Sequence, residues 1–189
     1  ISNLQRQILF KTSDVGRSKT EAGAAALEAL NPHVAVEAVS DRLTEANAAA
    51  RLNGVDLILD GSDNFATRRI VNAAAIGAGV PLLSGAIGRW DGQVSLFHPA
   101  EGGPCYACLF PKDPQGAAAA PCEEAGVVGA LAGVVGAMMG LEAIKRLTGA
   151  GETLLGRLWL YDALEASVRV IRIQRDPDCA LCRSVAPAR

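Results

Sequence analysis

The hydrophobic and polar positions of the chain follow two periods, one typical of helices and one typical of strands. Stretches rich in Ala and Leu predict three helices, over 16–31, 45–52 and 64–78. The first ends before Pro32, which disfavours helical geometry at the preceding residue. Short apolar, often β-branched runs predict strands over 34–39, 55–59, 80–85 and 92–99. Because strands and helices alternate, we expect an α/β fold with a mainly parallel sheet and flanking helices.

The second half of the chain carries a long glycine-rich apolar stretch. No residue from Ala125 to Leu141 is charged, but the stretch is short for a membrane span and runs into Glu142. It therefore predicts a core helix ending near Leu147, in which pairs such as Gly129 and Gly133 let another helix approach closely. We expect 104–124 to be irregular and 158–161 and 168–173 to form late antiparallel strands. Residues 1–189 lack a repeat or a linker in sequence, which favours a single domain.

Composition narrows the function classes. Half of the residues are hydrophobic and 4% are aromatic, a balance that suits helices packed closely on a sheet. The net charge is -2, so nothing in the overall charge favours a nucleic acid or an anionic membrane as partner. The sequence shows no secretory signal peptide.

An acidic turn follows the predicted strand 55–59. It reads DGSDN and contains Asp60, Asp63 and Asn64. In an open parallel sheet, ligands bind at the carboxyl ends of the strands, where a carboxylate suits Mg²⁺ and a nucleotide phosphate. Asp63 or Asn64 is equally suited to cap the next helix. Both interpretations remain open from the sequence.

A nucleotide-binding sheet usually carries a Gly-rich loop after its first strand. The sequence contains no G-x-G-x-x-G motif and starts at Ile1 rather than at Met. Either the chain is not a nucleotide-binding domain or the loop precedes Ile1, and the missing Met favours the second interpretation. In that case we expect the chain by itself to bind a nucleotide weakly.

Four of the five cysteines form two C-x-x-C pairs, Cys105 with Cys108 and Cys179 with Cys182. Paired motifs in a chain without secretory features favour a metal over disulfides, although two redox pairs are an alternative. A fold that joins the pairs would give a closed four-thiolate site, which is typical of structural zinc. Cys122 is unpaired, and two adjacent glutamates disfavour its thiolate, so its local chemistry is that of an ordinary cysteine.

Together these segments resemble the adenylyltransferases that activate ubiquitin-like sulfur carriers, the MoeB/ThiF/HesA family related to ubiquitin-activating enzymes. The resemblance covers essentially the whole chain in the family's order. It rests on SNLQRQ, VGRSKTEA with LNPH, LDGSDNFATR, PLLSGAIGRWDGQV, PCYACLFP, CEEAGVVGALAGVVGAMMGLEAIK and CALC. The resemblance implies a Rossmann-like domain that is truncated at its N-terminus, with the nucleotide loop upstream of Ile1.

The resemblance implies that the C-terminal Gly-Gly carboxylate of a sulfur-carrier protein attacks ATP and releases pyrophosphate, in molybdopterin or thiamine biosynthesis. Asn3 and Arg6 match the family's nucleotide contacts, Lys19 its phosphate-binding lysine, and Asp63 its Mg²⁺ carboxylate, with Asn64 beside it. The four paired cysteines match its zinc ligands. Without the resemblance, Arg6 and Lys19 would be interpreted as solvated surface charges.

The resemblance leaves some questions open. Cys122 matches the crossover-loop cysteine, which joins the carrier covalently in some members and is dispensable in others. The family context implies a cytoplasmic homodimer without a nucleic-acid or membrane partner. The main alternative function is that of a zinc-stabilised module that binds a carrier protein without ATP chemistry. A dehydrogenase on a similar sheet is a weaker alternative.

Overall fold

The computed structural model describes residues 2–112 and 126–187, arranged as two compact units, Ile1–Arg42 and Leu43–Arg189. The first unit contains the short helices η1 (Ser2–Gln5) and η2 (Thr12–Asp14) and the helix α1 (Lys19–Leu30). Helix α1 ends at Leu30 with Asn31 as its C-cap, directly before Pro32, as the sequence predicts. Gly23 lies in its buried stretch, where an added Cβ would lie 3.4 Å from Leu9.

The predicted strand over 34–39 is wrong. These residues have no regular structure, and all but Val36 are exposed. A strand is stabilised by hydrogen bonds to a neighbouring strand, and the described part of this unit contains none. The β-branched pattern alone does not supply that partner.

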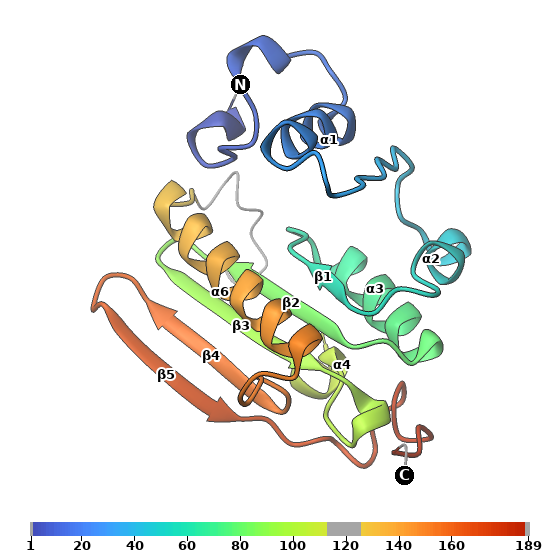
Figure 1. Ribbon diagram of the computed structural model, residues 1–189. Coiled ribbons are helices and arrows are strands. Elements are labelled where there is room, and N and C mark those ends of the chain that lie inside the picture. The colour runs from blue at the N-terminus through green and yellow to red at the C-terminus, as the bar shows by residue number, and fades with distance from the viewer. Residues whose placement is uncertain (1, 113–125, 188–189) are drawn as a thin grey trace. The chain divides into compact units, whose positions relative to one another are not determined.

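The second unit is built on a five-stranded sheet with the spatial order β1-β2-β3-β4-β5 (Figure 1). Strands β1 and β2 are parallel, with Ile58 opposite Leu82, and the other three pairs are antiparallel. The strands are β1 (Ile58–Asp60), β2 (Leu82–Ile87), β3 (Asp91–Phe97), β4 (Arg157–Asp162) and β5 (Ser167–Arg172).

The α/β class, the flanking helices and the late antiparallel strands are therefore confirmed, but the sheet is mixed where we expected a mainly parallel one. The reason is the connection between β2 and β3, which is too short for a crossover. It spans 88–90 and closes with a hydrogen bond from Gly88 N to Asp91 O of 2.7 Å. A link this short joins neighbouring strands as a hairpin, which makes them antiparallel.

One face of the sheet is covered by the glycine-rich helix α6 (Gly129–Thr148), which Figure 1 shows lying across β2 and β3. Its core residues Leu131, Val135 and Met139 pack on the sheet. The glycines that allow this close approach lie in the strands: a Cβ at Gly85 would lie 2.2 Å from Met139 Sδ, and one at Gly92 would lie 2.6 Å from Val135 Cγ2.

Our expectation for the helix glycines is thus corrected. A Cβ added at Gly133, Gly136 or Gly140 would meet no described atom within 4 Å, so these glycines do not mediate close packing in this structure. Glu142, on the same helix, is buried and accepts a 2.7 Å hydrogen bond from Leu154 N, which ties α6 to the segment before β4. None of the described helices has the length and apolar character needed to cross a membrane.

The opposite side of β1 and β2 packs against α3 (Phe65–Ala78), whose boundaries follow local signals. Asn64 caps its start, and Gly79, with φ of 66°, ends it in the left-handed conformation that glycine adopts most easily. Helix α2 (Glu45–Arg51) packs on α3 and confirms the helix expected there. The segment expected to be irregular contains a single helical turn, α4 (Tyr106–Leu109), which begins directly after Cys105 and contains Cys108.

Candidate functional site

The acidic turn lies at the carboxyl end of β1, directly before α3. Asp60 is buried, and its Oδ1 accepts a 2.8 Å hydrogen bond from Ser62 N. The carbonyl oxygen of Ser62 accepts two hydrogen bonds from the guanidinium of Arg68, from Nε at 3.1 Å and from Nη2 at 2.5 Å. The main-chain N–H of Ser62 is therefore held by the buried Asp60 side chain, and its carbonyl group is held by the buried Arg68 side chain.

The structure separates the two interpretations of this turn. Asn64 is the cap, because its Oδ1 accepts a 2.8 Å hydrogen bond from Thr67 N. Its side-chain amide also donates to Asp63 Oδ1 at 3.3 Å. Asp63, the residue before this cap, is exposed, so its carboxylate is accessible to a cation or a ligand from solvent.

The predicted phosphate-binding residues belong to the first unit. Arg6 Nη2 donates a 3.0 Å hydrogen bond to Asn3 Oδ1, so the structure brings these two half-buried residues together. Lys19 is exposed at the first position of α1. Because Asp63 belongs to the second unit, a site shared by Asp63 with Arg6 and Lys19 stays a prediction.

The two C-x-x-C pairs meet in space, and their four sulfur atoms lie within 4.8 Å of one another. The Sγ–Sγ distances are 3.8 Å for Cys105–Cys108, 3.6 Å for Cys105–Cys179 and 3.5 Å for Cys108–Cys182. Three of the four residues are buried, and Cys108 is half-buried. This cysteine cluster fixes the C-terminal segment to the segment around α4, and it could hold a metal ion.

Electrostatics at the cysteine cluster favour a bound cation. Burial raises the pKa of Cys105, and it raises the pKa of Cys182 to about 11. At Cys179 burial acts in the same direction, but hydrogen bonds from the main chain at Cys182 and Leu181 lower the pKa overall. Buried thiolates at Cys105 and Cys182 therefore need a positive charge nearby, which a coordinated metal supplies.

Cys122 lies outside the described residues, so its predicted role is not tested by the structure.

Several buried or half-buried arginines were missed by the sequence analysis. Arg175 donates to the carbonyl oxygens of Cys182 and of Val185, the latter at 2.7 Å, and thereby supports the cysteine cluster. Arg68 supports the acidic turn. No local pattern distinguishes these residues from surface arginines, because their acceptors are main-chain carbonyls that the fold brings to them.

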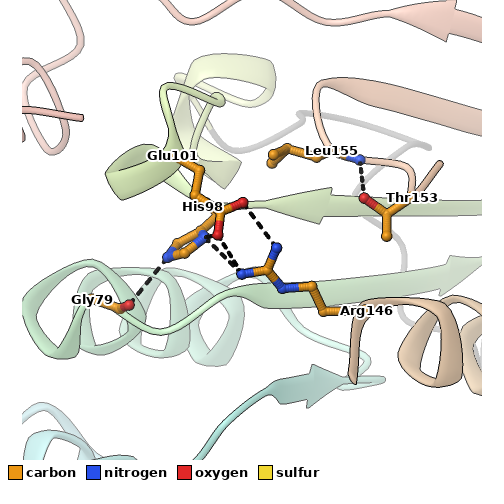
Figure 2. Close-up of polar contacts among 6 residues, drawn as sticks. All are labelled: Gly79, His98, Glu101, Arg146, Thr153 and Leu155. Atoms are coloured by element: carbon orange, nitrogen blue, oxygen red, sulfur yellow. Dashed lines mark hydrogen bonds and ion pairs between the residues drawn. The ribbon is translucent and has the colours of Figure 1, made fainter. Parts of the chain in front are cut away.

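A second polar cluster lies at the opposite end of the sheet, where β2 begins and β3 ends (Figure 2). The His98 ring donates from Nε2 to Gly79 O at 3.1 Å, and Arg146 binds both carboxylate oxygens of Glu101 at 2.6 and 2.8 Å. The hydrogen bond from Arg146 lowers the pKa of Glu101, and Glu101 raises the pKa of Arg146. This cluster ties the end of α3 to η3 (Pro99–Glu101) and α6.

Sequence comparisons place these features among known proteins. The ThiF family profile matches residues 1–181. The chain is 52% identical over 186 residues to the sulfur carrier protein adenylyltransferase of Thermus thermophilus, covering 96% of this chain and 69% of that protein. It is 42% identical over 182 residues to the molybdopterin-synthase adenylyltransferase of Escherichia coli, covering 96% of this chain and 72% of that protein.

Other relatives are longer. The chain is 48% identical over 179 residues to a probable adenylyltransferase/sulfurtransferase MoeZ of Mycobacterium tuberculosis, covering 93% of this chain and 46% of that protein. Among solved structures, E. coli MccB with ATP has a TM-score of 0.81 at 21% identity, covering 97% of this chain and 56% of that one. The chain thus spans between about half and three quarters of the lengths of these proteins.

The structural likeness confirms the Rossmann-like fold, and the sequence match extends over nearly the whole chain. The sequence resemblance is therefore confirmed as well, and this chain belongs to the ThiF family.

Proposed function

We propose that the native protein is an ATP-dependent adenylyltransferase that activates the C-terminal glycine carboxylate of a ubiquitin-like sulfur-carrier protein. The observation that carries the proposal is the exposed Asp63 carboxylate, held at the carboxyl end of a parallel strand in a ThiF-family chain. Relatives named as adenylyltransferases for sulfur carriers and for molybdopterin synthase support it. The proposal covers carriers of both molybdopterin and thiamine biosynthesis.

In this proposal the carrier carboxylate attacks the α-phosphate of ATP, forming an acyl-adenylate and releasing pyrophosphate. The protein's task is to position the reactants and to neutralise phosphate charge, since its side chains form no bond to the carrier in this step. Arg6 offers a planar guanidinium for two-point phosphate binding, with Asn3 beside it, and Lys19 offers an exposed point charge.

Asp63 is the residue proposed to hold Mg²⁺, oriented by the side-chain amide of Asn64. An exposed carboxylate would suit Mg²⁺, a hard cation that favours oxygen ligands. When bound, the ion would neutralise charge on the phosphates. The chain's own contribution is to hold the carboxylate in a fixed direction while the triphosphate and the carrier tail approach.

The cysteine cluster is proposed to hold a structural Zn²⁺. Four thiolates at about 2.3 Å from a tetrahedral zinc ion lie about 3.8 Å from one another. The Sγ–Sγ distances of 3.5 to 3.8 Å for three of the pairs are close to this spacing, and all four sulfur atoms lie within 4.8 Å of one another. A four-cysteine site has no open position for substrate, so its role in the proposal is to stabilise the C-terminal segment.

The proposal also includes a homodimer located in the cytoplasm, as the family resemblance implies. Cys122 is a candidate for covalent attachment of the carrier, again from the resemblance alone. Covalent attachment at Cys122 is separate from the adenylylation step.

Carrier-dependent exchange of radioactive pyrophosphate into ATP tests the proposal in the native protein. We expect exchange that requires both a Gly-Gly-terminated carrier and Mg²⁺, and that is lost in Asp63→Asn. Arg169→Ala is a suitable control because Arg169 is exposed on β5. Carrier binding without any exchange would refute the adenylyltransferase proposal and favour a binding module without ATP chemistry.

A further inference from the structure

Arg68 occupies an unusual position for a charged residue. It lies in the first turn of α3 and is 8% exposed. The N-terminal end of a helix carries partial positive charge and disfavours a cation. The guanidinium donates to the carbonyl oxygens of Ser62 and Gly85 and also interacts with the Tyr106 hydroxyl, although burying a charge is costly unless it is well paired. Such a departure from local preference is typical of a functional position.

The contacts of Arg68 connect the turn after β1 to the middle of β2. Its Nε and Nη2 donate to Ser62 O, in the turn after β1, and Nη2 also lies 3.4 Å from Gly85 O, in β2. The guanidinium carbon lies 6.0 Å from the centre of the Phe65 ring, which limits its movement from another side. A single side chain thus connects β1, β2 and α3 at the edge of the sheet where ligands bind in this fold class.

The held carbonyl belongs to the peptide unit that leads into Asp63. A peptide unit is planar, so fixing the oxygen of Ser62 also fixes the nitrogen of Asp63. On the other side, Asp60 Oδ1 accepts from Ser62 N and fixes the preceding peptide unit. The main chain that carries Asp63 is therefore immobilised by buried groups, while the Asp63 carboxylate itself remains exposed.

We propose that Arg68 is a positioning residue for Asp63, acting through the Ser62–Asp63 peptide unit. The proposal rests on the proposed function, because it assigns the direction of the Asp63 carboxylate a role in holding Mg²⁺ with ATP. A displacement of about 1 Å at a reacting group costs on the order of 100-fold in rate. Loss of the Arg68 hydrogen bonds should therefore lower kcat and raise the Mg²⁺ concentration that the reaction needs. No group that contacts the substrate is removed.

The test uses the native protein, the carrier and a titration of Mg²⁺ at saturating ATP. Arg68→Met keeps most of the side-chain volume and removes the donors, and Arg68→Lys keeps the charge but offers one nitrogen for two separate carbonyl groups. We expect kcat for pyrophosphate exchange to fall roughly 100-fold in Arg68→Met and about tenfold in Arg68→Lys. The Mg²⁺ concentration for half-maximal exchange should rise about tenfold or more in both.

Two controls separate positioning from a structural role. Arg169→Ala removes an exposed arginine from β5 and should leave kcat and the Mg²⁺ titration at wild-type values. In Arg68→Ala, guanidinium ion at low, non-denaturing concentration should restore part of kcat, because it can replace the missing donor group. A residue that served stability alone would change the melting temperature and leave the Mg²⁺ titration of the folded fraction unchanged.

The outcomes are distinguishable from failure of the proposed function. If the wild-type protein shows no carrier-dependent exchange, the proposed function fails first. If the wild-type exchanges and folded Arg68→Met and Arg68→Lys keep its Mg²⁺ dependence, the positioning role is refuted while the proposed function stands. Unfolding of Arg68→Lys, monitored by circular dichroism, would also refute it, since a lysine retains the charge and the stem.

Discussion

Replacement of Cys105 by Ser tests whether the cysteine cluster is a structural metal centre. Cys105 is fully buried and lies 74 positions before Cys179, its partner at 3.6 Å. A serine hydroxyl is a poor ligand for zinc, so one substitution should open the site and release the ion. The C-terminal segment would then lose its connection to the segment around α4.

The magnitude follows from the length of the loop that the metal closes. In the chain-entropy treatment of cross-links, a link across about 75 residues contributes about 4–5 kcal/mol to the free energy of unfolding. A metal held by both cysteine pairs imposes a comparable constraint. For a chain of 189 residues, about 1 kcal/mol corresponds to a change of roughly 2–4 °C in melting temperature. We therefore expect Cys105→Ser to lower Tm by roughly 10–15 °C.

Calorimetry of the native protein, together with metal analysis by plasma mass spectrometry, measures both effects. Wild-type protein should carry one zinc ion per chain, and Cys105→Ser should carry none. Cys122→Ser is the matched control, because it removes the cysteine outside the two C-x-x-C pairs, and it should retain the metal. One equivalent of metal and an unchanged Tm in Cys105→Ser would refute the reasoning. Two disulfides found by thiol alkylation would do so as well.

Three further predictions follow from the structure. Asp63→Ala should abolish carrier-dependent exchange and change Tm by no more than about 2 °C, because the side chain is exposed; a large loss of Tm would contradict this. Arg146 lowers the pKa of Glu101, so the stability that the pair contributes is present above pH 4.5 and is lost as the pH falls through the lowered value. In urea unfolding from pH 6 down to pH 3, Glu101→Gln should lose less of its free energy of unfolding than the wild type. Identical pH dependence of the free energy of unfolding in the two proteins would exclude this contribution. Gly92→Ala should reduce the free energy of unfolding by about 1–3 kcal/mol, because the added Cβ would lie 2.6 Å from Val135 Cγ2; a wild-type urea midpoint would show that α6 moves away without cost.

The helix boundaries could be predicted from the sequence because they depend on neighbours within one turn. Asn64 caps α3 through the main chain of Thr67, and Gly79 ends the helix with a positive φ. Pro32 limits α1 in the same local way. The two C-x-x-C motifs are also local signals, and their spacing predicted correctly that the fold has to bring them together.

Strand pairing could not be predicted in the same way. The pattern over 34–39 is typical of a strand, but these residues find no partner among the described residues of their unit. The sheet is mixed because a short link turns the chain back after β2, whereas the apolar character of β2 and β3 alone suits either direction. Hydrogen-bond partners in a sheet come from distant segments, so local sequence does not determine them.

The sequence by itself determined the family, the helices and the residue types of the candidate site, from the acidic turn to the four cysteines. Tertiary structure decided which polar side chains are buried and what they hold. Arg68 and Arg175 look like surface residues in sequence, yet their guanidinium groups fix main-chain carbonyls at the acidic turn and at the cysteine cluster. The physical reason is that helix caps and metal motifs act over a few residues, whereas the cost of burying a charge is offset by acceptors that only the folded chain assembles.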